Sequence, residues 1–168
     1  MYTVRRLNPD DAGQLWRLRL EALETDPQAF RETAAEHRRR TVESYAEQLT
    51  SNDNRSFVMG AFDPTLNLVG MAGFYSKQPD AGCIWGMYLT PSHRGTGLGA
   101  KLVNAIVDQA RRSPEIEAIH LTVAHSQPAA RRLYERCGFT ISPEKPTTIC
   151  GGNLPEDQDN MVLRILNP

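Results

Sequence analysis

The chain has 168 residues, of which 40% are hydrophobic and 23% are charged, and its formal net charge is −1. This length suits one domain, residues 1–168, with a sizeable core. The longest basic run, Arg38 to Arg40, is too short to indicate nucleic acid or an anionic membrane as a partner. No apolar run approaches a membrane span and the first residues lack the apolar centre of a signal peptide, so we expect a cytoplasmic protein.

The three cysteines, Cys83, Cys137 and Cys150, are odd in number and widely spaced. This pattern predicts neither a disulfide framework nor a zinc site. We expect each cysteine to be a small buried hydrophobic residue.

The first half of the chain predicts a strand, two helices and three strands. Asn8 followed by Pro9 is a helix-start signal, and a capping residue such as Thr41 is another. The expected elements are a strand at 2–7, a helix from Pro9 that ends at Asp26-Pro27, a loop or broken helix at 28–40, a helix capped by Thr41 with Val42, Tyr45, Ala46 and Leu49 inward, and strands at 56–62, 68–75 and 83–89.

A glycine-rich turn follows the strand at 83–89. Arg94 is followed by Gly95, Gly97 and Gly99, after which apolar residues recur at helical spacing. The first amides of a helix have no internal partner, and the helix dipole adds partial positive charge there. Glycines let an anion come close to those amides, and Arg94 adds a positive charge at the mouth. We therefore interpret this turn as a phosphate cradle.

Two other phosphate-binding loops fit this turn less well. A Walker loop needs Gly-Lys-Ser/Thr, whereas Lys101 lies between Ala100 and Leu102. Gly95-x-Gly97-x-x-Ala100 satisfies the looser dinucleotide fingerprint, but the acid expected about 20 residues later is missing. A dinucleotide-dependent oxidoreductase is therefore disfavoured and ranks third among the function classes. A turn without any ligand is also disfavoured, because one glycine would suffice to end a strand.

The second half of the chain predicts two helices and three strands. The expected elements are a helix from Leu98 to Ser113-Pro114, a strand at 118–123, a helix capped by Ser126 that Gly138 ends after Cys137, and strands at 139–150 and 160–166 around a polar loop at 151–159.

Two motifs resemble the GCN5-related N-acetyltransferase (GNAT) superfamily. The segment 94–99, Arg-Gly-Thr-Gly-Leu-Gly, resembles its Arg/Gln-x-x-Gly-x-Gly/Ala pyrophosphate loop. The segment 130–139 is similar to its Ala-x-x-Leu-Tyr-x-x-x-Gly-Phe helix. The order of predicted elements is also that of the superfamily, so the resemblance covers essentially the whole chain.

The resemblance implies a three-layer α/β/α arrangement of the α+β class, with a mixed, mostly antiparallel seven-stranded sheet flanked by about four helices. The strands ending at Leu89 and at 118–123 should run parallel and then splay apart, leaving backbone groups for the pantetheine arm of acetyl-CoA. Acetyl-CoA is the implied co-substrate, with no metal. The implied coenzyme contacts are Met87, Tyr88, Leu89, Arg94, Gly95, Thr96, Gly97, Leu98, Gly99, Gln127, which stands where many relatives carry Asn, and Ala130.

The resemblance also implies direct attack of a primary amine on an acyl carbonyl that the Leu89 amide polarises. Tyr134 matches the tyrosine that in many relatives protonates the departing sulfur. A packing role at helical spacing with Ala130 and Leu133 competes with that function, and both can hold at once.

The general base is the point at which this sequence departs from several relatives. Thr122 stands where some of them carry a glutamate, and the strand at 83–89 contains no carboxylate. His120 lies two residues earlier and should share the face of Thr122. With an unperturbed pKa of about 6.5, an imidazole can accept a proton near neutrality. The alternatives are an inert His120 and an amine that binds already neutral.

The acetyl acceptor is less well defined by the sequence. Trp85 and Met87 should share a face if their strand alternates, either as core residues or as a wall of the acceptor site. We expect His37, His93 and His125 to be solvated in loops.

Two charged segments are candidates for shaping the acceptor site. A basic one holds Arg31, His37, Arg38, Arg39 and Arg40, and an acidic one holds Glu156, Asp157 and Asp159. If the basic segment faces the cleft, it suits an amine that carries a carboxylate or phosphonate, such as an amino acid or analogue. If neither does, both are solvated loops.

The expected function is therefore an acetyl-CoA-dependent N-acetyltransferase acting on a primary amine of a small molecule or of a protein. The alternative is a non-catalytic acyl-CoA-binding or sensing module on the same fold. We expect a monomer or a homodimer.

Overall fold

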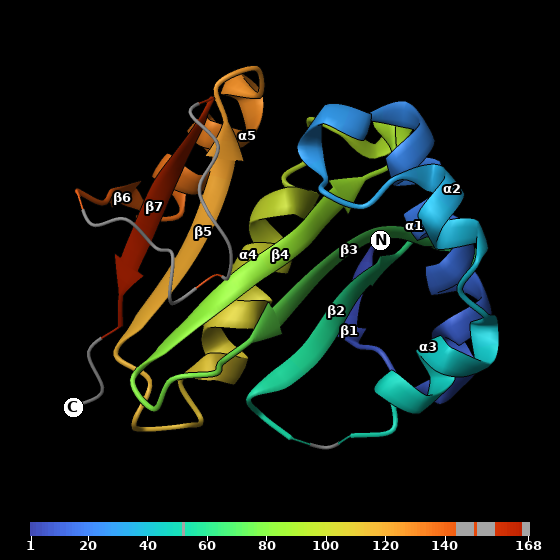
Figure 1. The fold of residues 1–168 in the computed structure, drawn as a ribbon, viewed down its shortest axis with the longest axis horizontal. Coiled ribbons are helices and arrows are strands. Elements are labelled where there is room, and N and C mark those ends of the chain that lie inside the picture. The colour runs from blue at the N-terminus through green and yellow to red at the C-terminus, as the bar shows by residue number, and fades with distance from the viewer. Residues whose placement is uncertain (52, 144–149, 151–156, 166–168) are drawn as a thin grey trace.

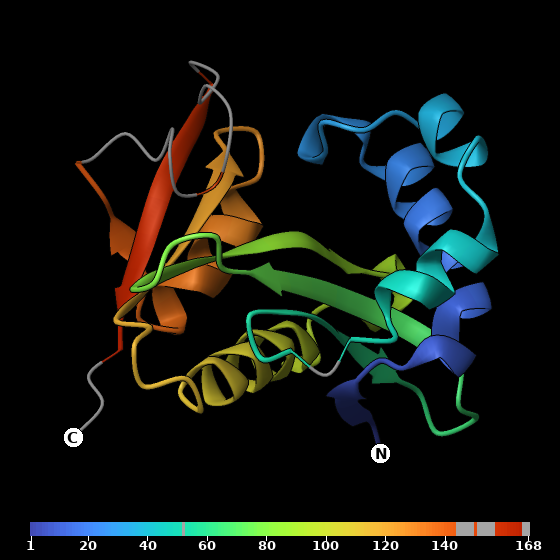
Figure 2. The same cartoon turned by 60° about the horizontal axis from the view of Figure 1, so that its bottom comes forward.

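The computed structural model of the protein describes residues 1–51, 53–143, 150 and 157–165. Seven strands form one sheet in the order β1-β2-β3-β4-β5-β7-β6, with helices on both faces (Figures 1 and 2). Every neighbouring pair is antiparallel except β4 and β5. In the described part of the chain, no helix is long and apolar enough to cross a membrane.

The elements follow one another in the predicted order, with one short additional helix, α2. In chain order they are β1 (Thr3–Arg6), α1 (Ala12–Thr25), α2 (Ala34–Arg38), α3 (Val42–Gln48), β2 (Ser56–Phe62), β3 (Leu68–Tyr75), β4 (Ala81–Leu89), α4 (Leu98–Ala110), β5 (Ala118–Ala124), α5 (Pro128–Arg136), β6 (Thr140–Ile141) and β7 (Gln158–Arg164). The predicted fold class, a mixed and mostly antiparallel seven-stranded sheet covered by helices, is confirmed. Of the strand expected at 139–150, β6 covers only two residues, and 144–149 lie outside the described residues.

Side-chain caps lie at the start of two helical segments on one face of the sheet. In the 3-10 turn Pro9–Asp11 that leads into α1, Asn8 accepts a hydrogen bond from the Asp10 amide at 2.9 Å, and Asp11 accepts one from the Asn8 amide at 2.8 Å. Thr41 caps α3 as predicted by accepting from the Ser44 amide at 3.1 Å. These bonds satisfy amides that have no partner inside the helix.

Two predictions about helix ends are wrong. The N-cap of α5 is Gln127 and not Ser126, because Pro128, whose fixed φ suits the first helical position, begins the helix. Val42 was expected to point inward, but it is 38% exposed as the first residue of α3.

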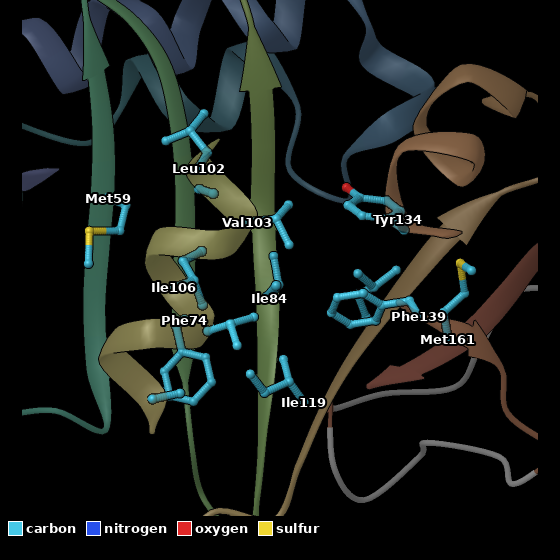
Figure 3. Close-up of a cluster of buried hydrophobic side chains, with 14 of the residues drawn as sticks. Met59, Phe74, Ile84, Leu102, Val103, Ile106, Ile119, Tyr134, Phe139 and Met161 are labelled. Atoms are coloured by element: carbon cyan, nitrogen blue, oxygen red, sulfur yellow. The ribbon is translucent and has the colours of Figure 1, made fainter. Parts of the chain in front are cut away.

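The core is divided between the two faces of the sheet. One cluster lies under α4 and α5 and includes Leu102, Ile106, Tyr134 and Phe139 (Figure 3). The other joins α1 and α3 to the opposite face, which we call the α1 face. Residues alternate between faces along a strand, so Ile119, Leu121 and Val123 of β5 enter the first cluster, and His120 and Thr122 point to the α1 face.

The parallel strands β4 and β5 separate soon after they begin. They pair only at Ala81, Gly82 and Cys83, which face Ala118, Ile119 and His120. Beyond these pairs the two strands diverge, as Figure 1 shows. The predicted splay is therefore present, and it leaves the edge of β4 that faces β5 unpaired by β5 from Ile84 to Leu89.

A bulge in β4 overturns the prediction that Trp85 and Met87 share a face. Met71 of β3 pairs with Tyr88, and Gly73 pairs with Trp85, so Gly86 and Met87 together oppose one residue of β3. Gly86 has φ +66°, a conformation that favours glycine. Met87 packs into the cluster under α4, whereas Trp85 covers Gly73 on the α1 face and is 41% exposed.

A disulfide joins Cys83 to Cys150, which corrects the expectation that the cysteines form none. Cys83 is buried and belongs to the last pair before β4 and β5 separate, so the bond anchors residue 150 there. The bonded residues are 67 positions apart, and the spacing of three cysteines contains no sign of this pairing. Cys137 is free and half-buried.

Candidate functional site

The glycine-rich turn after β4 forms an open cradle at the start of α4. A single 3-10 turn, Pro91–His93, leads into it, and Gly97 is the N-cap of α4. Gly95 and Gly97 have φ of +77° and +82°, which an L side chain adopts at a cost. A Cβ atom at either position would meet nothing within 4 Å. The turn therefore presents bare backbone and empty space.

The amides of this cradle are available to a ligand. Within the described residues, the backbone hydrogen bonds of the turn use the Arg94 amide, which donates to the Pro91 carbonyl, but not the amides of Gly95, Thr96 and Gly97. The first amides of α4, starting at Leu98, have no acceptor inside the helix. The helix dipole adds partial positive charge. A phosphate group fits this donor set and the space above it.

Arg94 does not extend freely over the cradle. Its Nε donates to the Leu89 carbonyl at 2.8 Å, and its Nη2 bonds Asp26, just after α1, at 2.8 Å. The guanidinium carbon lies 5.5 Å from the centre of the Tyr88 ring. Arg94 thereby joins the end of β4 to the end of α1, and Asp26 offsets the charge predicted at the cradle mouth.

Gly99 has a packing role in addition to its predicted coenzyme contact. A Cβ at this position would lie 2.9 Å from Leu133 Cδ2 of α5 and 3.5 Å from Met87 Cε of β4. The absence of a side chain therefore lets α4, α5 and β4 meet closely beneath the cradle.

Tyr134 lies on α5 between the separating strands. Its side chain is buried, and its ring meets Phe139 edge to face at 6.1 Å between centroids. In Figure 3 the hydroxyl oxygen points toward β4 and away from Phe139. Burial raises the pKa of Tyr134 well above its ordinary value, so the phenol keeps its proton at neutral pH. The packing and the proton-holding interpretations are compatible here. Gln127 and Ala130, at the start of the same helix, are half-buried.

His120 lies on the α1 face of β5, as its spacing from Thr122 predicts. It pairs with Cys83 across the parallel strands and with Val162 of β7 on the other side. Its residue is 4% exposed. The disulfide thus adjoins the predicted base.

Glu21 of α1 makes polar contacts with the end of β4, the strand predicted to bind the coenzyme, and the sequence does not reveal these contacts. Its Oε2 accepts hydrogen bonds from the Tyr88 hydroxyl at 2.7 Å and from Thr90 Oγ1 at 2.9 Å. Burial, together with the Glu21 carboxylate, raises the pKa of Tyr88 to about 12. The two partners lie 67 positions apart, so no local pattern points to them.

A buried polar cluster joins α1 to the segment after it. His37 was expected to be solvated, but it is 0% exposed, which corrects that prediction. Its Nε2 lies 2.9 Å from the Trp16 carbonyl and its Nδ1 3.2 Å from the Tyr45 hydroxyl. These two bonds satisfy both ring nitrogens, which is what allows a histidine to be buried.

Arg19 and Glu32 complete this cluster. Arg19 Nε lies 3.6 Å from Glu32 Oε1, and each side chain is 13% exposed. Arg19 follows the spacing of Leu15, Leu18 and Ala22, the apolar stripe of α1. A charged residue in an apolar stripe is the sequence signal that could have identified it.

The other candidate histidines and charges are mostly paired. His93 is half-buried with its Nδ1 2.7 Å from the Tyr2 hydroxyl, and the exposed His125 faces Asp159 at 3.1 Å. Arg38 pairs with Glu24. Glu156 lies outside the described residues. Within those described, no group of three or more histidines, cysteines or acids could hold a metal ion.

A groove of about 550 Å³ opens on the α1 face of the sheet. Trp85 and Tyr75 line it from the strands, and Glu47, Gln48 and Leu49 line it from α3 and its end. Trp85 precedes the bulge at Gly86, so the groove and the bulge adjoin along β4.

Comparison with known proteins agrees with this architecture. The model of the acetyltransferase (GNAT) family matches residues 17–139. The chain resembles the L-methionine sulfoximine/L-methionine sulfone acetyltransferase of Salmonella typhimurium, with 41% identity over 36% of this chain and 34% of that protein. It also resembles the spermidine N(1)-acetyltransferase of Vibrio cholerae, with 30% identity over 58% of this chain and 56% of that one. The matches thus span about a third and about half of these relatives.

Solved structures share the fold over nearly the whole chain. A phosphinothricin acetyltransferase from Sinorhizobium meliloti in complex with acetyl-CoA superposes with a TM-score of 0.75, 18% identity and coverage of 98% of this chain and 89% of that one. An acetyltransferase from Salmonella typhimurium solved with acetyl-CoA superposes with a TM-score of 0.73 and 22% identity. The match covers 100% of this chain and 96% of that one.

Proposed function

Because the chain belongs to the GNAT acetyltransferase family, we propose that it is an acetyl-CoA-dependent N-acetyltransferase of small primary amines. The amine would attack the thioester directly, and one domain, residues 1–168, would carry the activity. The observation that carries this proposal is the open cradle of backbone amides at the start of α4, which follows the part of β4 that has separated from β5.

The coenzyme would be held by the chain's backbone. The amides from Gly95 to Gly99 suit the pyrophosphate, and the edge of β4 that β5 does not pair, at Met87, Tyr88 and Leu89, suits the pantetheine arm. Gln127 and Ala130, at the start of α5, are the other two residues that we propose to contact the coenzyme. When bound, acetyl-CoA supplies an activated acetyl thioester.

Tyr134 is the proposed proton donor to the departing sulfur. The raised pKa of its phenol keeps the hydrogen on Tyr134 Oη, from which it can be donated as the sulfur becomes negative. A thiol has an ordinary pKa of about 8.5, so full transfer from a less acidic phenol is uphill. Tyr134 therefore acts chiefly by a hydrogen bond that is strongest in the transition state.

His120 remains the proposed general base, because it lies on the α1 face of β5 at the splay. Its burial and its neighbour Cys83 favour proton transfer through a water over direct contact with the amine.

The acetyl acceptor would bind on the α1 face, and a small molecule is favoured over a protein amine. The relatives named for methionine sulfoximine and for spermidine both act on small amines. Arg40, from the basic segment proposed for the acceptor site, pairs with Glu32, which also faces Arg19 of α1 on this side of the sheet.

The experiment that tests this function is release of free thiol from acetyl-CoA with a panel of amines. The panel contains amino acids, polyamines and a peptide with a free N-terminus. We expect thiol release and acetylated amine in equal amounts for at least one small amine. Coenzyme binding without thiol release from any amine would instead indicate the non-catalytic binding module.

The cellular setting is also a proposal. We propose a monomer or homodimer in the cytoplasm. The balanced charge supports the proposal that neither nucleic acid nor a membrane is a partner. The Cys83–Cys150 disulfide weighs against this location, because the cytosol normally keeps thiols reduced.

A further inference from the structure

Arg19 of α1 carries a guanidinium that lies beside the bulge of β4. A Cβ at Gly86 would lie only 3.2 Å from Arg19 Nη1, so a residue without a side chain leaves room for it. The guanidinium carbon also lies over the Phe30 ring, 4.7 Å from its centre. Arg19 therefore meets β4 on the α1 face, whereas Met87 beside it faces α4.

The positive charge at this point is only partly offset. Glu32 Oε1 is 3.6 Å from Arg19 Nε, which is too long for a hydrogen bond, and Glu32 Oε2 is bonded to Arg40 Nε at 2.7 Å. One carboxylate thus faces two guanidinium groups. Burial raises the pKa of Tyr75, and the charge of Arg31 opposes that rise, so Arg31 also acts on this side of the sheet.

Arg19 Nη1 is buried and donates no hydrogen bond within the part of the chain that the structure describes. Buried donors in folded proteins nearly always have an acceptor, because an unmade hydrogen bond costs free energy. In a region with excess positive charge, an anionic oxygen is a stronger acceptor than a neutral one. A planar guanidinium suits a carboxylate in particular.

We propose that Arg19 binds the carboxylate of the acetyl acceptor, which is therefore a primary amine that carries a carboxylate, such as an amino acid. This inference rests on the proposed acetyl transfer. Gly86 lies between Cys83, where β4 and β5 separate, and Leu89, which precedes the cradle. A carboxylate at Arg19 would thus lie across β4 from the coenzyme side.

The same charge argues against polyamines as acceptors. Two like charges a few ångströms apart repel, and the repulsion is stronger in a partly buried site than in water. A carboxylate on the acceptor offsets that repulsion, whereas a second ammonium group adds to it. Trp85, half-exposed in the groove beside Gly86, offers an aromatic surface to the rest of the acceptor.

The test compares the common L-amino acids with their α-carboxamides as acceptors for the parent enzyme and for Arg19→Gln. The carboxamide keeps the size of the amino acid and removes its charge. We expect the parent to prefer at least one acid over its carboxamide in kcat/KM. Arg19→Gln should lower the value for that acid by about tenfold to a hundredfold and leave the carboxamide unchanged, as expected for a lost charge-assisted hydrogen bond.

Matched variants separate recognition from folding. Arg17→Gln changes an exposed arginine of the same helix and should leave the preference intact. Arg19→Gln with Glu32→Gln removes the unpaired carboxylate that the single variant leaves behind, so a double variant that folds stably and still lacks the preference supports the proposal. Calorimetric titration of the acids into protein saturated with coenzyme A gives a readout that needs no turnover.

The outcomes distinguish this inference from the proposed function. Acetylation of amines with equal kcat/KM for acids and carboxamides would overturn the role of Arg19 and keep the acetyltransferase. Acid binding that depends on Arg19 without any thiol release would support the inference and refute the proposed transfer. Absence of both acid binding and acid preference would overturn the inference that Arg19 binds the carboxylate of the acceptor.

Discussion

At the scale of single residues, Tyr134 is the side chain whose chemistry can be separated from its packing. Tyr134→Phe keeps the ring against Phe139 and removes the hydroxyl that faces β4. We expect kcat to fall by roughly a hundredfold, with the affinity for acetyl-CoA nearly unchanged, because the hydroxyl acts in the transition state. A stability loss with normal kcat in steady-state assays would support the packing role alone.

The pH dependence of kcat/KM tests His120 and Tyr134 together. If His120 is the base, kcat/KM falls as the pH drops far enough to protonate its imidazole, and His120→Ala loses that acidic limb. The phenol of Tyr134 must be protonated, and burial raises its pKa above the usual 10.0, so it produces no basic limb below that pH. Superimposable profiles for parent and variant would eliminate His120 and leave a neutral amine or an ordered water.

At the scale of elements, replacing glycine by alanine should change stability differently in α1 and in α4, because α4 packs closely against α5. Gly13 in α1 has open space where a Cβ would lie, so Gly13→Ala should stabilise the protein by about 0.5 to 1 kcal/mol. At Gly99 a Cβ would press on Leu133 Cδ2 at 2.9 Å, and the contact offsets that gain. Urea unfolding should place Gly99→Ala below Gly13→Ala, and equal stabilities would contradict the close packing.

Elements set by local signals could be predicted from the sequence, and elements set by distant contacts could not. The strands at 56–62 and 68–75 and the start of α4 at Leu98 agree with the prediction, because their patterns lie within each segment. The bulge at Gly86 depends on pairing with β3, so strict alternation gave the wrong face for Trp85. The burial of His37 could not be predicted, because its partners, Trp16 and Tyr45, come from two other helices.

The candidate site shows the same division. The cradle residues follow from glycine spacing before a helix, and their free amides agree with that prediction. Arg19 was missed although it lies in the apolar stripe of α1, because only the bulge of β4 gives its guanidinium a place. Coenzyme contacts and catalytic roles for the predicted residues stay predictions.

At the scale of the whole molecule, the Cys83–Cys150 disulfide links β4 to the segment before β7. The bonded cysteines are 67 positions apart, and closing so long a loop stabilises the fold by about 4 kcal/mol in the chain-entropy model. We expect dithiothreitol to lower the melting temperature of the parent but not that of the Cys83→Ala/Cys150→Ala variant. Titration of the denatured, unreduced protein should find the thiol of Cys137 alone, and three free thiols would refute the bond.

We propose that the cradle before α4 binds the phosphates of acetyl-CoA for acetyl transfer. The most direct measurement is kcat/KM for acetyl-CoA in Gly97→Asp compared with Gly97→Asn. Both side chains tolerate the left-handed backbone at φ +82° and enter the same open space, but only Asp adds a negative charge. We predict that the Asp variant loses at least about tenfold more than the Asn variant, because like charges a few ångströms apart repel. Equal values in two folded variants would contradict the claim.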